Sequence, residues 1–511
     1  MFEKAKYIFR PSNAFLFFGI AFVFQLFYLI TFKTFDSPDT KGLYFLKGDG
    51  YQYVEYCENL YKYGTYFEGK NGIPSSYTSR MPGMSILYLP IRLLFNQNTT
   101  LNLVVLFQAL FAALASYFIA LIALKSFKSN SAFYLSFILY ATCTIIANFN
   151  HRLYSESQAL STIVFAYYFF FNYLEKKQIW YLLLSSLCLI WCVFLRPFVA
   201  PFIVIATLYL FYLLIKRIIT LKHVLIFILP VFICFGTWTY RNYHLTKLFI
   251  PLQTGWEGSK STQSLENFIE TFGLGWIWWD PTSEHTWFMD DQTISFFRTK
   301  RPDDSIFDNW YSKHIFSKEL TIDTLKKARF YYWQSNNDSL SLNERDYYTE
   351  ESSKILDRFV LNQQETHPFL YYFGYRIKLL QKHLNHRLGA GVFSYKYPLN
   401  VVITFLDAIA NSFIFTFGFI SLLLLLFIKK YRTVEMVSII LFPTFILVFF
   451  SFYLRNDESR FITMAVPFLL LCGVQGFEYI CSLRYKYIYL SLIGLYLLYS
   501  GIFAVTHFIR W

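Results

Sequence analysis

The sequence predicts an all-α membrane protein that crosses the bilayer with about eleven helices. Its 511 residues are 55% hydrophobic and 22% aromatic, and only 15% of them are charged. This composition is too apolar for a soluble domain of the same size. Apolar runs of bilayer-spanning length recur along the chain, and short basic loops separate them. We therefore expect a polytopic membrane protein.

The first apolar run covers about residues 13–32 and follows a basic stretch with Lys4, Lys6 and Arg10. The run is long enough to span a bilayer, and no cleavage site of small residues follows it. We therefore expect a retained first helix with a cytoplasmic N-terminus rather than a signal peptide.

The remaining apolar runs differ in length. Residues 84–95 are too few to cross the bilayer and contain Pro90 and Arg92, so a juxtamembrane helix is expected there. The other runs are long enough to span. These further spans are expected at about 100–124, 131–149, 156–174, 179–195, 197–215, 222–239, 401–428, 434–453, 461–481 and 486–509.

The loops between the runs predict the orientation. If the spans alternate, the basic clusters all fall on one side, which the positive-inside rule assigns to the cytoplasm. These loops account for the formal net charge of +13, so that charge does not indicate nucleic-acid binding. The clusters are Lys125 with Lys128, Lys176 with Lys177, Lys216 with Arg217 and Lys222, Lys429 with Lys430 and Arg432, and Arg484 with Lys486.

Polar segments gather on the opposite, extracytoplasmic face and divide the chain into three expected parts. Residues 1–240 form a transmembrane module with a long first external loop at 34–98. Residues 241–400 form an extracytoplasmic loop or cap, and residues 401–511 form C-terminal transmembrane helices. The middle part is rich in charged residues, Asn, Ser and Thr, and it is long enough for a small folded domain.

The first external loop holds one acid and one base in fixed positions. Asp49 stands between Gly48 and Gly50, and glycine lets the backbone approach a ligand closely because it has no Cβ. Arg80 stands two residues before Pro82, and proline favours the start of a helix. Asp49 and Arg80 are therefore candidate site residues.

Two further external turns carry charged residues. Glu156 begins a span, where it is either a second site carboxylate or an acid that the helix dipole favours at a helix start. Arg455 and Arg460 flank Asp457 and Glu458. These arginines either bind phosphate or belong to a surface ion-pair cluster.

The external segment also contains a tryptophan cluster. Trp276, Trp278 and Trp279 lie within residues 273–281. Because Trp favours the headgroup level of a bilayer, the cluster is explained by an interfacial anchor. A platform on which a sugar ring stacks is the alternative.

The order and sidedness of these motifs resemble the GT-C glycosyltransferases that use polyprenyl-phosphate sugars. This branch includes the protein O-mannosyltransferases and the lipid A aminoarabinose transferases. The resemblance covers most of residues 1–245 and, more loosely, 400–511. The matching motifs are Asp49, Tyr53, Asn59-Leu60, Gly64-Thr65-Tyr66, Ser79-Arg80-Met81-Pro82-Gly83, Tyr154-Ser155-Glu156, Leu195-Arg196-Pro197 and Tyr240-Arg241-Asn242-Tyr243.

The resemblance implies a GT-C fold and an inverting enzyme of the bacterial cell membrane. It would move a sugar from a polyprenyl-phosphate donor to an acceptor hydroxyl of a glycan, a lipid or a protein on the extracytoplasmic side. A carboxylate can accept the proton that the hydroxyl loses, and fixed cations can stabilise the departing phosphate. The implied residues are Asp49 and Glu156 for catalysis, Arg80, Arg455 and Arg460 for the donor phosphate, and Tyr53, Arg196, Arg241 and Trp276 for substrate binding.

The first loop argues against a metal-bridged mechanism. Several members of the family have two adjacent acids there, whereas Gly50 follows Asp49 in this chain. No spacing of His, Cys or carboxylates indicates a structural metal. We therefore expect no cofactor. The resemblance to the family leaves a divalent metal ion open as an alternative.

A lipid-linked glycan transporter or an O-antigen-type polymerase is the alternative function, since each is also a basic, aromatic, many-helix membrane protein. A transporter is expected to place charges in mid-span or to have repeated halves with broken helices. Here the charged residues gather at external helix ends, and the halves differ in loop length. This pattern favours the transferase.

Overall fold

The computed structural model confirms an all-α, multi-pass membrane protein. It describes residues 10–36, 42–46, 48–253, 264–265, 267–268, 271, 317–335, 337, 339–384, 399–428, 433–453 and 459–508. Within these ranges, eight helices are long and apolar enough to cross a bilayer. They are Ala14–Phe32, Gln97–Phe127, Pro197–Ile215, Leu221–Thr246, Thr404–Phe427, Val434–Tyr453, Arg460–Cys481 and Lys486–Thr506.

Three other expected spans are helices that are shorter or more polar. The run at 131–149 breaks into α6 (Asn130–Ala141) and the short α7 (Thr144–Ala147), and α9 (Ile179–Leu195) has only 17 residues. α8 (Ser155–Lys176) has 22 residues, but its first two turns are rich in Ser, Thr, Gln and Glu. Those side chains are buried, so neighbouring helices rather than lipid surround them.

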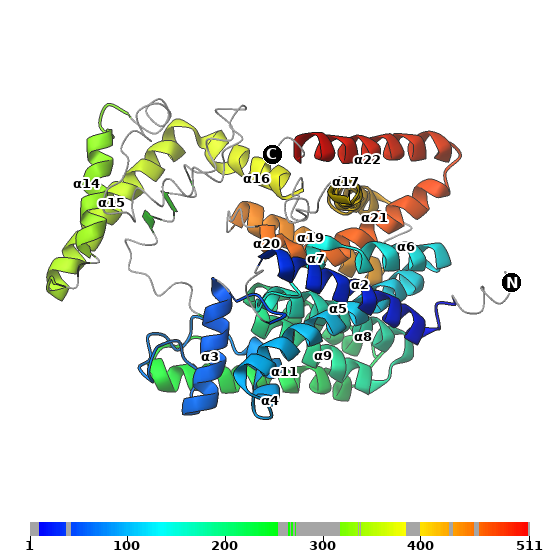
Figure 1. Cartoon of the computed structure of the whole chain (residues 1–511), viewed down its shortest axis with the longest axis horizontal. Coiled ribbons are helices and arrows are strands. Elements are labelled where there is room, and N and C mark those ends of the chain that lie inside the picture. The colour runs from blue at the N-terminus through cyan, green and yellow to red at the C-terminus, as the bar shows by residue number, and fades with distance from the viewer. Residues whose placement is uncertain are drawn as a thin grey trace. The chain divides into compact units, whose positions relative to one another are not determined.

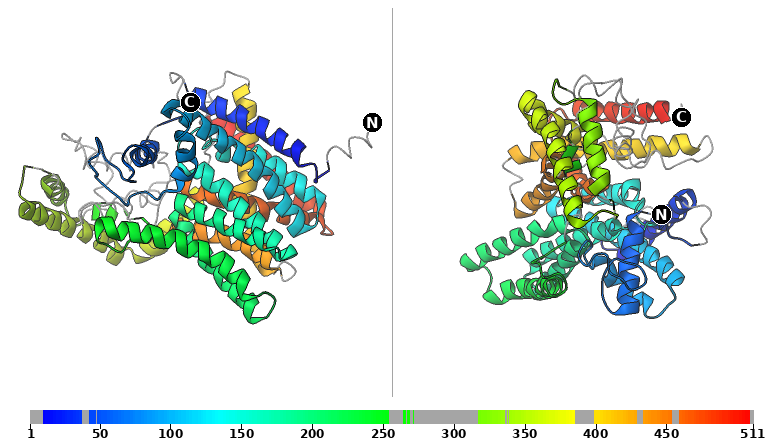
Figure 2. Two further views of the ribbon diagram at one scale, coloured as in Figure 1. Left: turned by 90° about the horizontal axis from the view of Figure 1, so that it is seen from below. Right: turned by 90° about the vertical axis from the view of Figure 1, so that its left-hand side faces the viewer.

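The helices of the bundle pack along one another in sequence-adjacent and distant pairs (Figures 1 and 2). α8 contacts both α5 and α9, and α11 contacts α9. In the C-terminal part, α18 packs against α21 and α17 packs against α22. These helices are α2 (Ala14–Asp36), α5 (Gln97–Phe127), α10 (Ala200–Ile215), α11 (Leu221–Thr246), α17 (Leu399–Ser412), α18 (Gly418–Phe427), α19 (Val434–Val448), α21 (Val466–Cys481) and α22 (Lys486–Phe508).

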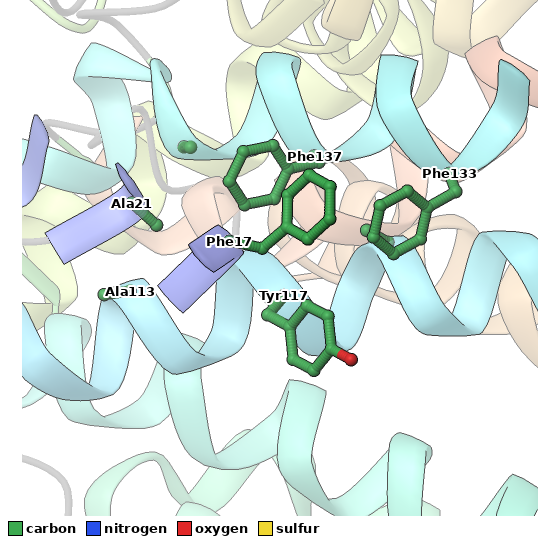
Figure 3. Packing of buried hydrophobic residues seen from close by; sticks show 8 residues of the cluster. Phe17, Ala21, Ala113, Tyr117, Phe133 and Phe137 are labelled. Carbon is green, nitrogen blue, oxygen red and sulfur yellow. The ribbon is translucent and has the colours of Figure 1, made fainter. Parts of the chain in front are cut away.

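An aromatic cluster joins α2, α5 and α6. The Phe17 ring meets the rings of Phe133 and Phe137 edge-on, with centroid distances of 5.0 and 4.9 Å. Ala21 and Ala113 lie beside these rings (Figure 3). Because alanine is small, it lets the helix backbones approach closely around the aromatic side chains.

The two ends of α8 carry charged residues that lie far apart. Glu156 lies in its first turn and Lys176 in its last, so about 30 Å of helix separates them. At the Lys176 end, Lys125 Nζ of α5 lies 2.6 Å from Glu175 Oε2. Lys125 and Lys176 therefore share one end of the bundle, as the loop charges predict. The assignment of that end to the cytoplasm stays a prediction, and Lys429 lies outside the described residues.

The chain divides into two compact units. The first contains Met1–Gly255, Leu384–Ile446 and Ser459–Trp511, and the second contains Trp256–His383 and Leu447–Glu458. In the second unit, α14 (Ile322–Ser335) packs against α15 (Leu342–Thr366), where Ser352 Oγ donates a hydrogen bond of 3.1 Å to the Ala328 carbonyl. A π-helical turn, Leu370–Gly374, and α16 (Tyr375–Leu384) follow.

Candidate active site

The first external loop enters the site through α3 (Asp49–Tyr63), which begins at the predicted acid. Gly48 precedes it with a φ of +53°, a conformation that glycine adopts without strain. A Cβ at Gly50 would lie 3.3 Å from Cε1 of Tyr154, so the glycine lets α3 approach the residue before α8. The two glycines around Asp49 thus serve a backbone turn and a close helix contact.

Backbone pairing ties this loop to the turn before α8. The Phe45 N–H donates to the His151 carbonyl at 2.7 Å, and the Leu153 N–H donates to the Phe45 carbonyl at 3.2 Å. Gln108 Nε2 of α5 donates to the carbonyls of Asn150 and Arg152 at 3.0 and 2.9 Å. The turn that leads to Glu156 is therefore fixed from both sides.

Arg80 is positioned by the segment that leads into α4 (Gly83–Arg92). The Tyr66 hydroxyl donates to the Met81 carbonyl at 2.9 Å. Trp191 Nε1 of α9 donates to the Gly83 carbonyl at 3.0 Å. α4 therefore starts against the end of α9, and Arg80 is held beside the bundle. As expected, this apolar segment is a short helix rather than a span.

Asp49 bridges two arginines. Its Oδ1 lies 3.1 Å from Nη2 of Arg80, and its Oδ2 lies 2.7 Å from Nη1 of Arg460. Arg460 comes from the short helix α20 (Ser459–Ile462), ahead of α21. The side chains of Asp49, Arg80 and Arg460 are 29%, 21% and 25% exposed, so all three are within reach of a ligand.

The two guanidinium groups set the charge of Asp49. Burial raises the pKa of its carboxyl, but the attraction of Arg80 and Arg460 outweighs burial and holds that pKa below its usual value. Arg196 adds a smaller lowering effect on the same pKa. Asp49 is therefore ionised at neutral pH, and as long as both arginines contact it, it is a weak base.

Glu156 forms a second, buried ion pair. Its side chain is 1% exposed and pairs with Nη2 of Arg196, which is 9% exposed. Arg460 Nε lies 3.9 Å from Glu156 Oε1, so Arg460 stands between the two carboxylates. The structure therefore brings together Asp49, Arg80, Glu156, Arg196 and Arg460, which the sequence had predicted as site residues.

Gln52 and Glu68 complete the surroundings of Arg80, and neither was predicted. Gln52 Oε1 accepts hydrogen bonds from Nε and Nη2 of Arg80 at 3.2 and 2.7 Å. Gln52 Nε2 donates to Glu68 Oε1 at 3.1 Å, and the Ser79 hydroxyl donates to Glu68 Oε2 at 3.0 Å. Gln52 follows Asp49 by three residues, so helical spacing on α3 was the available signal.

Tyr53 supports Arg80 and connects two elements. The guanidinium carbon of Arg80 lies 4.9 Å from the centroid of the Tyr53 ring. The Tyr53 hydroxyl shares a hydrogen bond of 3.0 Å with Ser155 Oγ at the start of α8. Its predicted substrate contact stays a prediction, while its position beside Arg80 is a structural fact.

The other predicted binding residues are placed differently. Arg241 of α11 donates to the carbonyls of Tyr66 and Tyr77 and lies over the Trp238 ring at 4.8 Å. Arg241 therefore holds the first external loop onto α11. Trp276 and Arg455 lie outside the described residues.

One buried acid within a membrane span was not predicted. Asp407 of α17 accepts hydrogen bonds from the Thr144 hydroxyl and, at 3.0 Å, from Asn411 Nδ2. These contacts tie α17 to α7. The two donors explain how the carboxyl is tolerated inside the bundle.

Among the described residues, no group of three or more His, Cys, Asp or Glu side chains is arranged to hold a metal ion. Both oxygens of Asp49 contact guanidinium groups instead. The expectation that the protein needs no cofactor stays a prediction.

Comparison with known proteins finds a likeness to solved structures. No model of a known protein family matches the chain, and no curated protein matches its sequence. The archaeal oligosaccharyltransferase AglB from Archaeoglobus fulgidus, solved with an inhibitory peptide and a dolichol-phosphate, is similar with a TM-score of 0.41 and 12% identity. The likeness covers 97% of this chain and 56% of that chain. At this level of likeness, the activity is inferred from the site itself.

The arrangement places three guanidinium groups beside two carboxylates. Arg80, Arg196 and Arg460 are opposed by two carboxylates, Asp49 and Glu156, so the cluster retains positive charge. The trio of Asp49, Arg80 and Arg460 is partly exposed and can contact a ligand. The buried Glu156–Arg196 pair fixes the helix ends behind it.

Proposed function

We propose that this protein is a GT-C-type glycosyltransferase that moves a sugar from a polyprenyl-phosphate donor to an acceptor hydroxyl on the extracytoplasmic side. The observation that carries the proposal is the partly exposed Arg80–Asp49–Arg460 trio. Arg80 and Arg460 present fixed cations, and Asp49 presents an ionised carboxylate between them. A reaction that expels phosphate and removes a proton needs both kinds of group.

The location of the trio suits a lipid-linked substrate. Arg460 precedes the first turns of α21, and Asp49 lies against the start of α8, so the trio sits at helix ends. A polyprenyl donor would bring its phosphate to this depth while its chain stays among apolar side chains.

The charge change in the reaction explains why the arginines act on the chemical step. The donor is a phosphodiester with one negative charge, and the leaving polyprenyl phosphate carries up to two. Arg80 and Arg460 therefore attract the leaving group more strongly than the bound donor. Attraction that increases toward the transition state lowers the barrier.

The proton follows a short route. The acceptor oxygen attacks the anomeric carbon as the bond from that carbon to the phosphate oxygen breaks. The hydroxyl proton passes to Asp49, and the products are the glycosylated acceptor and polyprenyl phosphate. Attack from the side opposite the phosphate inverts the anomeric centre. Glu156 is buried against Arg196 and keeps Arg460 in place. In this scheme Glu156 does not take the proton from the acceptor.

An apolar cavity of about 320 Å³ offers room for part of the polyprenyl chain. It is lined by residues of α8, α9, α10 and α19, including Tyr167, Phe202 and Ala206. Ala166, which also lines it, is ten residues beyond Glu156 on α8, or about 15 Å along the helix. The cavity therefore lies deeper in the bundle than the charged trio.

Binding of undecaprenyl phosphate to the purified protein in nanodiscs tests this proposal. We expect Arg80→Ala and Arg460→Ala each to weaken binding about tenfold, because a charge-assisted bond to phosphate is lost. Arg484→Ala is the matched control, since it removes one exposed cation beyond the far end of α21. Equal affinity of all four proteins would overturn the phosphate site.

A further inference from the structure

Asp49 occupies the place that an anionic ligand would take. Each of its oxygens contacts a different guanidinium group, at 3.1 Å for Arg80 and 2.7 Å for Arg460. Two oxygens of a phosphate group present the same pattern of acceptors to two arginines. The carboxylate and an incoming phosphate therefore compete for the same donors.

We propose that the phosphate of the donor displaces the Asp49 carboxylate from Arg80 and Arg460, and that this exchange makes Asp49 a stronger proton acceptor. The inference rests on the proposed function and adds the order of events at its site. Donor binding comes first and switches on the base, so that Asp49 accepts a proton efficiently only when a sugar is present to be transferred.

Each arginine has contacts besides Asp49, so neither has to follow Asp49 when it moves. Gln52 Oε1 holds Arg80 through two hydrogen bonds of 2.7 and 3.2 Å, and Tyr53 lies beneath its guanidinium group. Arg460 lies 3.9 Å from Glu156 and 5.1 Å from the Phe461 ring centroid. Asp49, in contrast, is in the first turn of α3 after a glycine and can turn away by rotating its side chain.

The charged surroundings explain why the exchange changes basicity. In the free protein, Arg80 and Arg460 contact Asp49, and Arg196 acts on it from farther away. Tyr154 also interacts with Asp49, and Glu156 lies 3.9 Å from Arg460. A bound phosphodiester takes both guanidinium groups away from Asp49 and places one negative charge nearby. Both changes favour the protonated carboxyl, so the pKa of Asp49 rises in the complex.

The exchange predicts that removing the charge of Asp49 tightens phosphate binding. The probe is farnesyl methyl phosphate, a phosphodiester whose charge does not change between pH 5 and 8, and the protein is the full chain in nanodiscs. We expect Asp49→Asn to bind it about three- to thirtyfold more tightly than wild type, because the competing ion pairs are lost. Glu55→Gln on the same helix is the control.

The control keeps the local structure while removing one negative charge. Glu55 Oε1 accepts a hydrogen bond of 3.1 Å from the Gly69 N–H, and the amide oxygen of glutamine can accept it too. We expect Glu55→Gln to bind the probe like wild type. Equal tightening by Glu55→Gln and Asp49→Asn would trace the effect to net charge and overturn the exchange.

A second measurement follows the protons that the wild-type protein takes up on binding. Calorimetric titration of the wild-type protein in two buffers with different ionisation enthalpies gives the protons taken up on binding. Because the pKa of Asp49 is higher in the complex, wild type takes up protons, and its affinity increases as the pH falls toward that raised pKa. Asp49→Asn lacks this uptake.

Two contrary results have different meanings. If probe binding needs Arg80 and Arg460 but wild type takes up no proton and Asp49→Asn binds no more tightly, the exchange is overturned while the proposed function stands. If neither Arg80→Ala nor Arg460→Ala changes the affinity for the probe, the proposed phosphate site is wrong, and the exchange is wrong with it.

Discussion

Asp49 and Arg460 are separated by 411 residues in the sequence, and their side chains pair at 2.7 Å. The first external loop therefore does not form the site alone, because α20, ahead of α21, supplies the second cation. A truncated N-terminal module would retain Asp49 and Arg80 but lose half of the anion site. The two parts of the bundle must therefore assemble to complete the trio of Arg80, Asp49 and Arg460.

The buried pair of Glu156 and Arg196 predicts a loss of stability on mutation. Glu156→Gln leaves the Arg196 guanidinium buried without its carboxylate partner, and such a loss costs about 3–5 kcal/mol. Replacing both residues, as Glu156→Leu with Arg196→Met, should recover most of it. Chemical unfolding in detergent measures the difference. If the single variant were as stable as wild type, the pair would not be holding the helix ends.

Gln52 is predicted to act by orienting Arg80. Gln52→Ala removes two hydrogen bonds to the guanidinium group but leaves the cation present. We expect undecaprenyl phosphate to bind about fivefold more weakly, because the lost hydrogen bonds hold Arg80 in the position in which it binds the phosphate. Glu55→Gln on the same helix should leave the affinity unchanged. Wild-type affinity in Gln52→Ala would remove Gln52 from the site.

The pH dependence of turnover should differ between its two kinetic parameters. kcat/KM reports the free enzyme, in which the pKa of Asp49 is held below its usual value, so the acid limb of kcat/KM should lie below the usual pKa of an aspartate. kcat reports the complex, in which the exchange raises that pKa. We therefore expect the acid limb of kcat at higher pH, with turnover falling as the carboxylate becomes protonated. Coincident limbs would count against the exchange.

The apolar cavity predicts a dependence on chain length. Ala206→Trp fills space that Ala206 lines, so it should weaken the binding of undecaprenyl phosphate more than that of farnesyl phosphate. Leu208→Trp on the same helix is the control, because Leu208 is exposed and does not line the cavity. If both chain lengths lose affinity equally, the cavity does not hold the polyprenyl chain.

The sequence could predict the bundle and the outer members of the site. Apolar runs and basic loops mark membrane helices because lipid requires internally satisfied backbones and apolar side chains. Glycines beside Asp49 and a proline after Arg80 point to these two residues, because glycine allows close backbone approach and proline favours a helix start. α8 showed the limit of hydropathy: its polar first turns face other helices, so its composition resembles that of a soluble helix.

The inner contacts of the site could not be predicted, because they depend on how irregular segments fold back. Glu68 follows the end of α3 at Gly64, and its contact with Gln52 depends on the path of the loop between them. Arg241 matched a motif of the resemblance, yet it donates to loop carbonyls. Asp407 lies within the expected span 401–428, but its contact with Thr144 depends on the short helix that breaks the run at 131–149.

Sugar release from a defined donor tests the central claim most directly. Undecaprenyl-phosphate-linked mannose, glucose and arabinose, each radiolabelled in the sugar, are offered to the protein in nanodiscs with cell-envelope extract as the source of acceptors. We predict that wild type transfers one of these sugars and that Asp49→Asn is slower by about a hundredfold to ten-thousandfold, as expected for a lost general base. Near-wild-type transfer by a folded Asp49→Asn protein would contradict the assignment of Asp49 as the proton acceptor.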